Sequence, residues 1–292
     1  MRPEKFGQWT LAEWIAWGRA ELSRAGIEEG REECELIWMK LLRSPRSCLY
    51  LQAHPDGFSR ALKSFLKFVE KRTRRIPLAY LLKEADFWRE TLFVDERCLI
   101  PRPETEILVE QVLKALGEDA GKNFTFLDIG TGSGAIAIAI LRTCPEARGT
   151  LLDVSADALD VARENVKRYA LEDRAKLVCG DLFDARDPSG RFDWIVSNPP
   201  YLSEADMKSL QEELKFEPSK ALDGGSDGLD LYRRIVREAT GRLNPGGAIG
   251  LEVGQGQADR VSKWLHEAGY VNIQRFKDHL GIERVIIAGY SS

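Results

Sequence analysis

The residues with the clearest chemical potential form the stretch Ser197-Asn198-Pro199-Pro200-Tyr201, which follows the apolar run from Phe192 to Val196. Asn198 would therefore lie at the carboxyl edge of a sheet, where open α/β folds bind ligands. The two prolines fix φ at successive positions and remove two backbone donors, which leaves a rigid loop with free carbonyl groups. The Asn198 side-chain oxygen and the Pro199 carbonyl could each accept one hydrogen of a planar NH₂ group, with the Tyr201 ring against its face. An ordinary proline turn after a strand explains the same residues equally well, so the rest of the chain must decide.

A glycine-rich loop, Asp128-Ile129-Gly130-Thr131-Gly132-Ser133-Gly134, ends an earlier apolar run and opens a helix at Ala135. Glycines allow the backbone to turn sharply and to approach a ligand closely, and the first turn of a helix offers free N–H groups. Asp153 ends the next apolar run, where a carboxylate can accept both hydroxyls of a ribose. Together these features predict a site for a nucleoside cofactor.

The glycines alone do not choose the cofactor, because Gly130, Gly132 and Ala135 also fit the dinucleotide fingerprint of NAD enzymes. Asp128 favours S-adenosylmethionine, since a carboxylate can face its cationic amino-acid end but would repel a pyrophosphate. Asp181, after the third strand, is placed for the adenine amino group. We therefore predict S-adenosyl-L-methionine as cofactor, and the expected cofactor-binding residues are Asp128, Gly130, Thr131, Gly132, Ser133, Gly134, Asp153, Val154, Asp181, Leu182 and Asn198.

Three segments with different periodicity divide the chain. Residues 1–85 have helical spacing and a net charge of +5, and the helix expected from Ser59 carries a cationic stripe that is either a solvated face or a docking surface. Residues 86–100 alternate and are rich in β-formers, which predicts a β-hairpin linker. Residues 101–292 contain the catalytic motifs, so we expect residues 1–85 to form a helical substrate-docking domain.

The catalytic segment alternates short apolar runs with helical stretches, which is typical of a parallel sheet covered on both faces. The expected strands are Phe124 to Ile129, Gly149 to Val154, Ala175 to Cys179, Phe192 to Ser197, Ala248 to Val253, Tyr270 to Phe276 and Glu283 to Ala288. The last two are joined by a connection too short for a crossover helix, so they should pair antiparallel. The predicted fold is Rossmann-like, with a seven-stranded sheet whose last strands are antiparallel.

Composition excludes several other classes. Five scattered cysteines without a C-x-x-C pair, and three isolated histidines, give no support for a metal site or a serine-histidine relay. No apolar run approaches the ~20 residues of a membrane span. The first ten residues show no signal or transit peptide. We expect a cytoplasmic monomer, without a metal and without membrane association.

Six motifs in order resemble the glutamine methyltransferases that modify peptide-chain release factors. They are Arg75-Ile76-Pro77-Leu78-Ala79-Tyr80, Ile100-Pro101-Arg102-Pro103-Glu104-Thr105-Glu106, Asp128 to Ile136, Asn198 to Tyr201, Ala221 to Gly225 with Asp227-Gly228-Leu229, and Glu252-Val253-Gly254. The resemblance implies a class I S-adenosylmethionine-dependent methyltransferase. It also implies that the substrate is the glutamine of the Gly-Gly-Gln motif in class 1 release factors, methylated on its side-chain nitrogen.

The residues agree with this chemistry. An amide nitrogen is a poor nucleophile, but its two N–H groups can be held by Asn198 and Pro199, so positioning supplies much of the rate. We expect Asn198, Pro199, Pro200 and Tyr201 to form the catalytic and substrate-binding loop. Three alternatives stay open: a glutamine methyltransferase of a ribosomal protein, an amino-methyltransferase of nucleic acid bases, and a binding module that has lost the chemistry. The acidic pI of about 5.7 disfavours stable nucleic acid binding.

Overall fold

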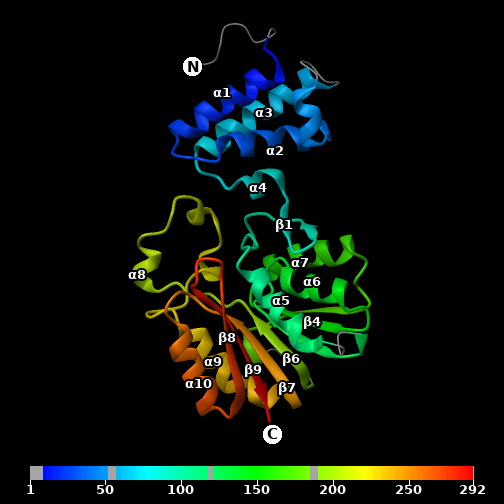
Figure 1. The fold of residues 1–292 in the computed structure, drawn as a ribbon, viewed down its shortest axis with the longest axis vertical. Coiled ribbons are helices and arrows are strands. Elements are labelled where there is room, and N and C mark those ends of the chain that lie inside the picture. Colours follow the sequence, from blue (N-terminus) through cyan, green and yellow to red (C-terminus); the bar gives the residue numbers. More distant parts are fainter. Residues whose placement is uncertain (1–8, 52–56, 118–120, 185–189, 292) are drawn as a thin grey trace. The chain divides into compact units, whose positions relative to one another are not determined.

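The computed structural model describes residues 9–51, 57–117, 121–184 and 190–291. The chain forms two compact units, residues 1–83 and residues 84–292 (Figure 1). Residues 1–8, on which the expected lack of a targeting peptide mainly rested, lie outside the described residues. No helix in the described part is both long and apolar enough to span a membrane.

The N-terminal unit is a helical bundle with its own core. Its elements are α1 (Leu11–Arg24), α2 (Gly30–Leu42), the 3-10 helix η1 (Arg46–Tyr50), α3 (Phe58–Thr73) and α4 (Leu78–Leu82). Trp38 of α2 stacks on Phe65 of α3, with ring centroids 4.7 Å apart, and both are fully buried. A buried ion pair between Arg72 and Glu33 (2.8 Å) joins the same two helices. Each of these helices thus contributes its apolar face to a common core.

A short hairpin opens the second unit. Its strands, β1 (Ala85–Phe87) and β2 (Glu90–Leu92), pair antiparallel. The hairpin is shorter than expected, because the strand pairing ends at Leu92 and residues 93–100 are irregular. Asn165 explains the difference: its side chain accepts from the Phe93 N–H (2.7 Å) and donates to the Phe93 carbonyl (2.8 Å). A side chain here replaces a partner strand.

The second unit is built on a seven-stranded sheet in the order β5-β4-β3-β6-β7-β9-β8. The strands are β3 (Thr125–Ile129), β4 (Arg148–Asp153), β5 (Ala175–Cys179), β6 (Phe192–Ser197), β7 (Leu243–Glu252), β8 (Tyr270–Lys277) and β9 (Glu283–Tyr290). The first five are parallel, whereas β9 pairs antiparallel with both β7 and β8. This confirms the predicted Rossmann-like fold, a seven-stranded sheet whose last strands are antiparallel.

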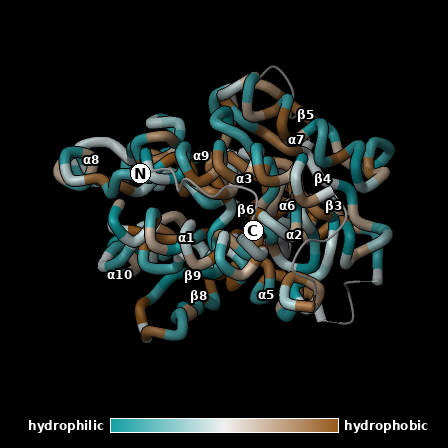
Figure 2. The backbone as a smooth tube through the Cα atoms, turned by 90° about the horizontal axis from the view of Figure 1, so that it is seen from above, coloured by the Kyte–Doolittle hydropathy of each residue, from teal (hydrophilic) through white to brown (hydrophobic). Residues whose placement is uncertain are grey.

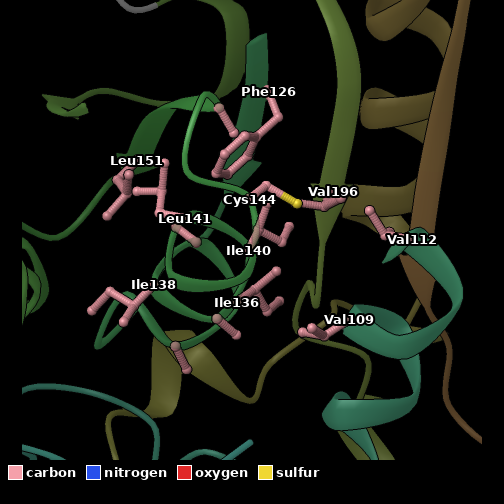
Figure 3. Close-up of a cluster of buried hydrophobic side chains, with 14 of the residues drawn as sticks. Val109, Val112, Phe126, Ile136, Ile138, Ile140, Leu141, Cys144, Leu151 and Val196 are labelled. Carbon is pink, nitrogen blue, oxygen red and sulfur yellow. The ribbon is translucent and has the colours of Figure 1, made fainter. Parts of the chain in front are cut away.

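Helices cover both faces of this sheet. Because side chains alternate along each strand, the residues of one strand show which helices lie on which face. The described helices are α5 (Thr105–Leu116), α6 (Ala135–Thr143), α7 (Ala156–Arg168), α8 (Glu204–Met207), α9 (Asp230–Ala239) and α10 (Ala258–Glu267), with 3-10 turns η3 (Leu182–Asp184), η4 (Glu213–Phe216), η5 (Ser219–Ala221) and η6 (Thr240–Arg242). Phe126 and Val196 pack toward α5 and α6, as Figure 3 shows, whereas Leu127 and Ile195 pack toward α9 and α10. Hydrophilic and hydrophobic stretches alternate along the backbone of α10 in Figure 2, as expected for a helix with one buried face.

Candidate active site

A cavity of about 370 Å³ lies at the carboxyl edge of the parallel strands of the second unit. It follows the ends of β3, β4, β5 and β6, the place where a doubly wound sheet binds its ligand. Nine of the predicted site residues line it: Gly130, Gly132, Asp153, Val154, Asp181, Leu182, Asn198, Pro199 and Pro200. The sheet therefore gathers residues that are distant in sequence into one site.

The glycine loop presents bare backbone to this cavity. Gly130 and Gly132 have φ values of +69° and +55°, and a side chain at either position would extend into open space. The Gly130 and Thr131 N–H groups both donate to the Leu152 carbonyl of β4, at 2.8 and 3.0 Å. The loop is thus anchored to the neighbouring strand on one side and leaves room for a ligand on the other.

Asp153 orders the loops around the cavity. Its Oδ2 accepts from the Gly132 N–H and its Oδ1 from the Ser155 N–H, both at 2.9 Å. Burial raises the pKa of Asp153, although these backbone N–H groups act in the opposite direction. Each carboxylate oxygen keeps further acceptor capacity, so Asp153 can hold the loop and accept hydroxyls of a ligand at the same time.

Asp128 lies beneath the loop and does not line the cavity. It is fully buried, its Oδ2 accepts from the Thr131 hydroxyl at 2.6 Å, and the Ala137 N–H also lies within reach of the carboxylate. Burial raises the pKa of Asp128 to about 7, and the Thr131 hydroxyl partly offsets this. Thr131 and Ser133 are buried as well, and neither they nor Gly134 line the cavity.

The segment after β5 supplies the far wall of the cavity. Leu182 is buried in a left-handed conformation with φ of +50°, and Asp181 forms an ion pair with Arg234 of α9 (3.1 Å). The Asp181 side chain is half exposed, so this pair is weak and the carboxylate remains open to other partners. The position thus agrees with a contact to a bound ligand.

Asn198 and Pro199 separate this cavity from a second one of about 210 Å³, since both residues line both cavities. The Asn198 Nδ2 donates to the Thr105 hydroxyl of α5 at 3.0 Å. No described residue donates a hydrogen bond to the Asn198 Oδ1 or to the Pro199 carbonyl. The loop therefore offers two acceptors at the boundary of the two cavities.

Tyr201 belongs to the second cavity alone. Burial raises the pKa of its hydroxyl to about 12, so this tyrosine is neutral and acts as a ring and a hydrogen-bonding group. Charged residues from two other segments complete the wall, namely Arg102 and Glu104 from one and Arg284 from the other. Arg102 is paired with Glu217, which also accepts from the Ile100 N–H at 3.1 Å. The lining of this cavity thus combines these charged residues with apolar ones such as Leu202 and Leu214.

A distant segment holds the proline loop in place. The Leu202 N–H donates to the Leu222 carbonyl (3.0 Å), and the Gly224 N–H donates to the Leu202 carbonyl (2.8 Å). Gly228 has φ of +74°, and a Cβ there would lie 2.3 Å from the Tyr201 carbonyl oxygen. The same carbonyl accepts from the Gln257 side chain at 2.9 Å. Two of the motifs noted in the sequence are therefore parts of one structural support.

Sequence reasoning assigned no role to several residues of the site. The main cavity is also lined by Arg97, Cys98, Leu99, Ser219, Lys220, Ala221, Leu231 and Ile235. Thr105 and Glu252 lie close behind Asn198, since Glu252 is within hydrogen-bonding reach of Thr105. Both occur in motifs that the sequence resemblance rests on, but only the fold brings them to Asn198. Within the described residues no cluster of three or more side chains suited to a metal ion occurs.

Comparison with known proteins identifies related chains. A family model described as "Methyltransferase small domain" matches residues 103–226, and one described as "PrmC N-terminal domain" matches residues 13–82. Two solved structures share the fold at low identity. A methyltransferase from Pyrococcus furiosus has a TM-score of 0.52 and 21% identity, covering 69% of this chain and 89% of its own. The 16S rRNA N2 G1207 methyltransferase of T. thermophilus, solved with AdoMet and guanosine, has a TM-score of 0.52 and 20% identity, covering 71% of this chain and 49% of its own.

Curated relatives are closer. The "Release factor glutamine methyltransferase" of Geobacter sulfurreducens is 38% identical over 286 residues, which cover 97% of this chain and 98% of the relative. The protein of the same name from Xylella fastidiosa (strain Temecula1) is 39% identical, covering 88% of this chain and 92% of its own. The first of these matches covers nearly the whole chain and therefore spans the N-terminal unit as well as the sheet, so the chain belongs to the release factor glutamine methyltransferase family.

Proposed function

We propose that this enzyme transfers a methyl group from S-adenosylmethionine to the side-chain amide nitrogen of the glutamine in the Gly-Gly-Gln motif of class 1 release factors, and so modulates translation termination. The observation that carries the proposal is the position of Asn198 and Pro199 in the wall between two cavities. A cofactor in the larger cavity and an amide in the smaller one would meet at these two residues.

The residues of the larger cavity fit S-adenosylmethionine. The open backbone at Gly130 and Gly132 accommodates a ligand, and Asp153 has acceptor capacity for ribose hydroxyls. Asp128, buried beneath the loop, places a carboxylate behind the cavity that would favour a positively charged group in it. When bound, the cofactor supplies an electrophilic methyl group on a sulfonium centre.

The chain's own residues provide orientation and desolvation. The Asn198 Oδ1 and the Pro199 carbonyl each accept one N–H of the glutamine amide, which turns the nitrogen toward the larger cavity. Tyr201, on the second cavity, packs against the flat face of the amide. No strong base has to act before the attack, because the nitrogen becomes acidic only after it has gained the methyl group. Positioning of this kind can contribute several kcal/mol to the rate.

We propose that residues 1–85 dock the release factor, that residues 86–100 serve as a hairpin linker and that residues 101–292 are the catalytic part. Lys63 and Lys67 are exposed on α3 and belong to its cationic stripe. The five cysteines are all free thiols, which supports a cytoplasmic enzyme. We further propose that it acts as a monomer on a protein substrate and binds no nucleic acid stably.

The docking role can be tested by truncation. A fragment starting at Glu84, where the second unit begins, should still bind S-adenosylmethionine but lose activity on an intact release factor. Full activity of this fragment would show that docking does not depend on the N-terminal unit.

Labelled S-adenosylmethionine tests the activity itself. The protein is incubated with a class 1 release factor, a ribosomal protein or unmethylated DNA, and mass spectrometry locates the methyl group. We expect one methyl group on the glutamine of Gly-Gly-Gln, and none on a release factor in which that glutamine is replaced by alanine. Label in the ribosomal protein or in DNA, with none in the release factor, would support the alternative substrates instead.

A further inference from the structure

A buried carboxylate lies behind the proline loop and takes no direct part in the proposed reaction. Glu252 is the last residue of β7 and is only 1% exposed. No hydrogen bond to its Oε2 is found among the described residues, and the Tyr232 hydroxyl donates to the Glu252 backbone carbonyl (2.8 Å) rather than to the carboxylate. Burying a carboxylate with so few partners is unfavourable, which suggests a role other than stability.

Thr105 connects this carboxylate to Asn198. Thr105 is the first residue of α5 and is 4% exposed. Its hydroxyl accepts from the Asn198 Nδ2 at 3.0 Å and lies within hydrogen-bonding reach of the Glu252 carboxylate. Three side chains from α5, β7 and the end of β6 therefore form one row, in which Thr105 and Glu252 are buried and Asn198 is half-buried.

The hydrogens along this row decide which end of the Asn198 amide faces the cavities. An ionised Glu252 can only accept, so the single hydroxyl hydrogen of Thr105 points to it. Thr105 is then an acceptor for Asn198, which takes up the NH₂ end of the amide and leaves the oxygen for the substrate. A neutral group at position 252 removes this constraint, because Thr105 can then donate to the Asn198 oxygen and the amide can turn over.

We propose that Glu252 and Thr105 are positioning residues that hold the Asn198 amide with its oxygen toward the glutamine substrate. The inference rests on the proposed methyl transfer through Asn198. With the amide reversed, two NH₂ groups would face each other, and the substrate would lose one of its two acceptors.

The surroundings of Glu252 make its charge sensitive to pH. Burial raises the pKa of Glu252 to about 7; Thr105, Arg284 and Arg102 act to lower it, and Glu104 raises it. Both arginines have carboxylates of their own: Arg284 bonds Asp278 at 3.0 Å, and Arg102 pairs with Glu217. The hydroxyls of Tyr201 and Tyr232 are the other titratable groups that Glu252 influences, and both have raised pKa values, so they stay neutral.

Isosteric variants test the proposal. We expect Glu252→Gln and Thr105→Val each to lower kcat by about tenfold or more, with cofactor Kd changed less than about twofold, whereas Thr105→Ser keeps most of the activity. The double variant should be no worse than Thr105→Val alone, since both changes break the same row. Thr125→Val is the matched control: it removes a hydroxyl that donates to Asp193 (3.1 Å) on the same sheet, and neither residue lines either cavity.

Two further readouts separate positioning from a structural role. In the wild type kcat should rise with pH through the range of the Glu252 pKa, and this rise should be absent in Glu252→Gln. Because folding raises the pKa of Glu252, the ionised carboxylate destabilises the folded state once the pH exceeds that pKa. At pH 8 the Glu252→Gln variant should therefore unfold at the same temperature as the wild type or at a higher one.

Unchanged kcat in both single variants, or equal loss in Thr105→Ser and Thr105→Val, would overturn the proposal. If Glu252→Gln does not fold, the two Thr105 variants still decide. A wild-type enzyme that methylates no release factor would instead refute the proposed function.

Discussion

The two halves of the site are built from loops with different backbone chemistry. Beside β3 and β4, glycines leave open space for a ligand, and their N–H groups are used to hold the loop against the Leu152 carbonyl and the Asp153 carboxylate. Beside β6 and β7, prolines remove N–H groups, so that a carbonyl and an amide oxygen are the available partners. The first half suits a bulky ligand with hydroxyl groups that Asp153 can accept, and the second suits a ligand that donates two hydrogens. The change from glycines in one loop to prolines in the other thus indicates that the two halves bind different ligands.

The halves also differ in how they are supported. The glycine loop is bonded to the adjacent strand through the Leu152 carbonyl. The proline loop depends on segments far away in the chain, including Thr105, Gly228 and Gln257. We therefore expect single substitutions to disturb catalysis more in the second half and cofactor binding more in the first.

The largest effect should follow Asn198→Ala. It removes an acceptor that only the substrate amide uses, so kcat should fall at least about a hundredfold, equivalent to ~3 kcal/mol, with a smaller change in cofactor affinity. Steady-state kinetics and calorimetry measure the two quantities. Asn244→Ala is the control, because Asn244 donates to Asp193 (2.7 Å), outside both cavities. A loss confined to cofactor affinity would remove the contrast between the halves.

Asp153→Ala should weaken S-adenosylmethionine binding by about 1.5 to 3 kcal/mol, because charge-assisted hydrogen bonds to the ligand and to the Gly132 N–H are both lost. Titration calorimetry of the variant measures this. Asp160→Ala, an exposed carboxylate paired with Arg163 on α7, should bind normally. Tight NAD binding by the wild type, without S-adenosylmethionine binding, would contradict the cofactor assignment.

Gly228→Ala tests the remote support of the proline loop. The added Cβ would collide with the Tyr201 carbonyl oxygen, so we expect a lower kcat and a loss of about 1 to 3 kcal/mol of unfolding free energy. Gly256→Ala has a similar φ of +78° but no atom within 4 Å of the new Cβ, so it measures backbone strain alone. Thermal unfolding and kinetics of both variants separate the collision from the strain. Equal effects in the two would mean that contact with Tyr201 is unimportant.

The smallest effect is expected on the N-terminal unit. Charge reversal at Lys63 and Lys67 together should raise KM for the release factor a few-fold at low salt and leave kcat unchanged, since exposed charges mainly affect encounter. The dependence of KM on ionic strength is the measurement. Reversal of Lys167 and Lys176, both exposed in the second unit, controls for net charge. The same KM in both double variants would make the stripe an ordinary solvated face.

The fold was largely predictable because buried parallel strands are continuous apolar runs. β5 and β6 have the bounds expected from the sequence. β7 begins at Leu243, five residues before its expected start at Ala248. The sequence predicts a turn there because the segment includes a Pro-Gly-Gly stretch. The structure instead keeps this stretch in the strand, with a bulge opposite Phe192 to Trp194. A local sequence pattern cannot show that a strand will tolerate a Pro-Gly-Gly stretch.

The cavity lining was predictable where a single motif determines the geometry, and it was not predictable where separate motifs meet. The glycine loop and Asp153 follow from spacing, and the structure bonds them to each other. Thr105 and Glu252 belong to segments far apart in sequence, and their relation to Asn198 depends on the order of β6, β7 and α5 in space. The residue types alone do not indicate a role for this threonine and this glutamate.

The bridge between Leu202 and Asp223 has a practical consequence for protein engineering. Residues 203–221 leave the sheet edge and return to the same point, so their length affects the free energy of folding only weakly. Lys208 and Ser209 are exposed at the far end of this excursion, whereas Leu214, also within it, lines the second cavity. A fluorescent label or short tag inserted between Lys208 and Ser209 should leave the enzyme folded and report the arrival of its substrate.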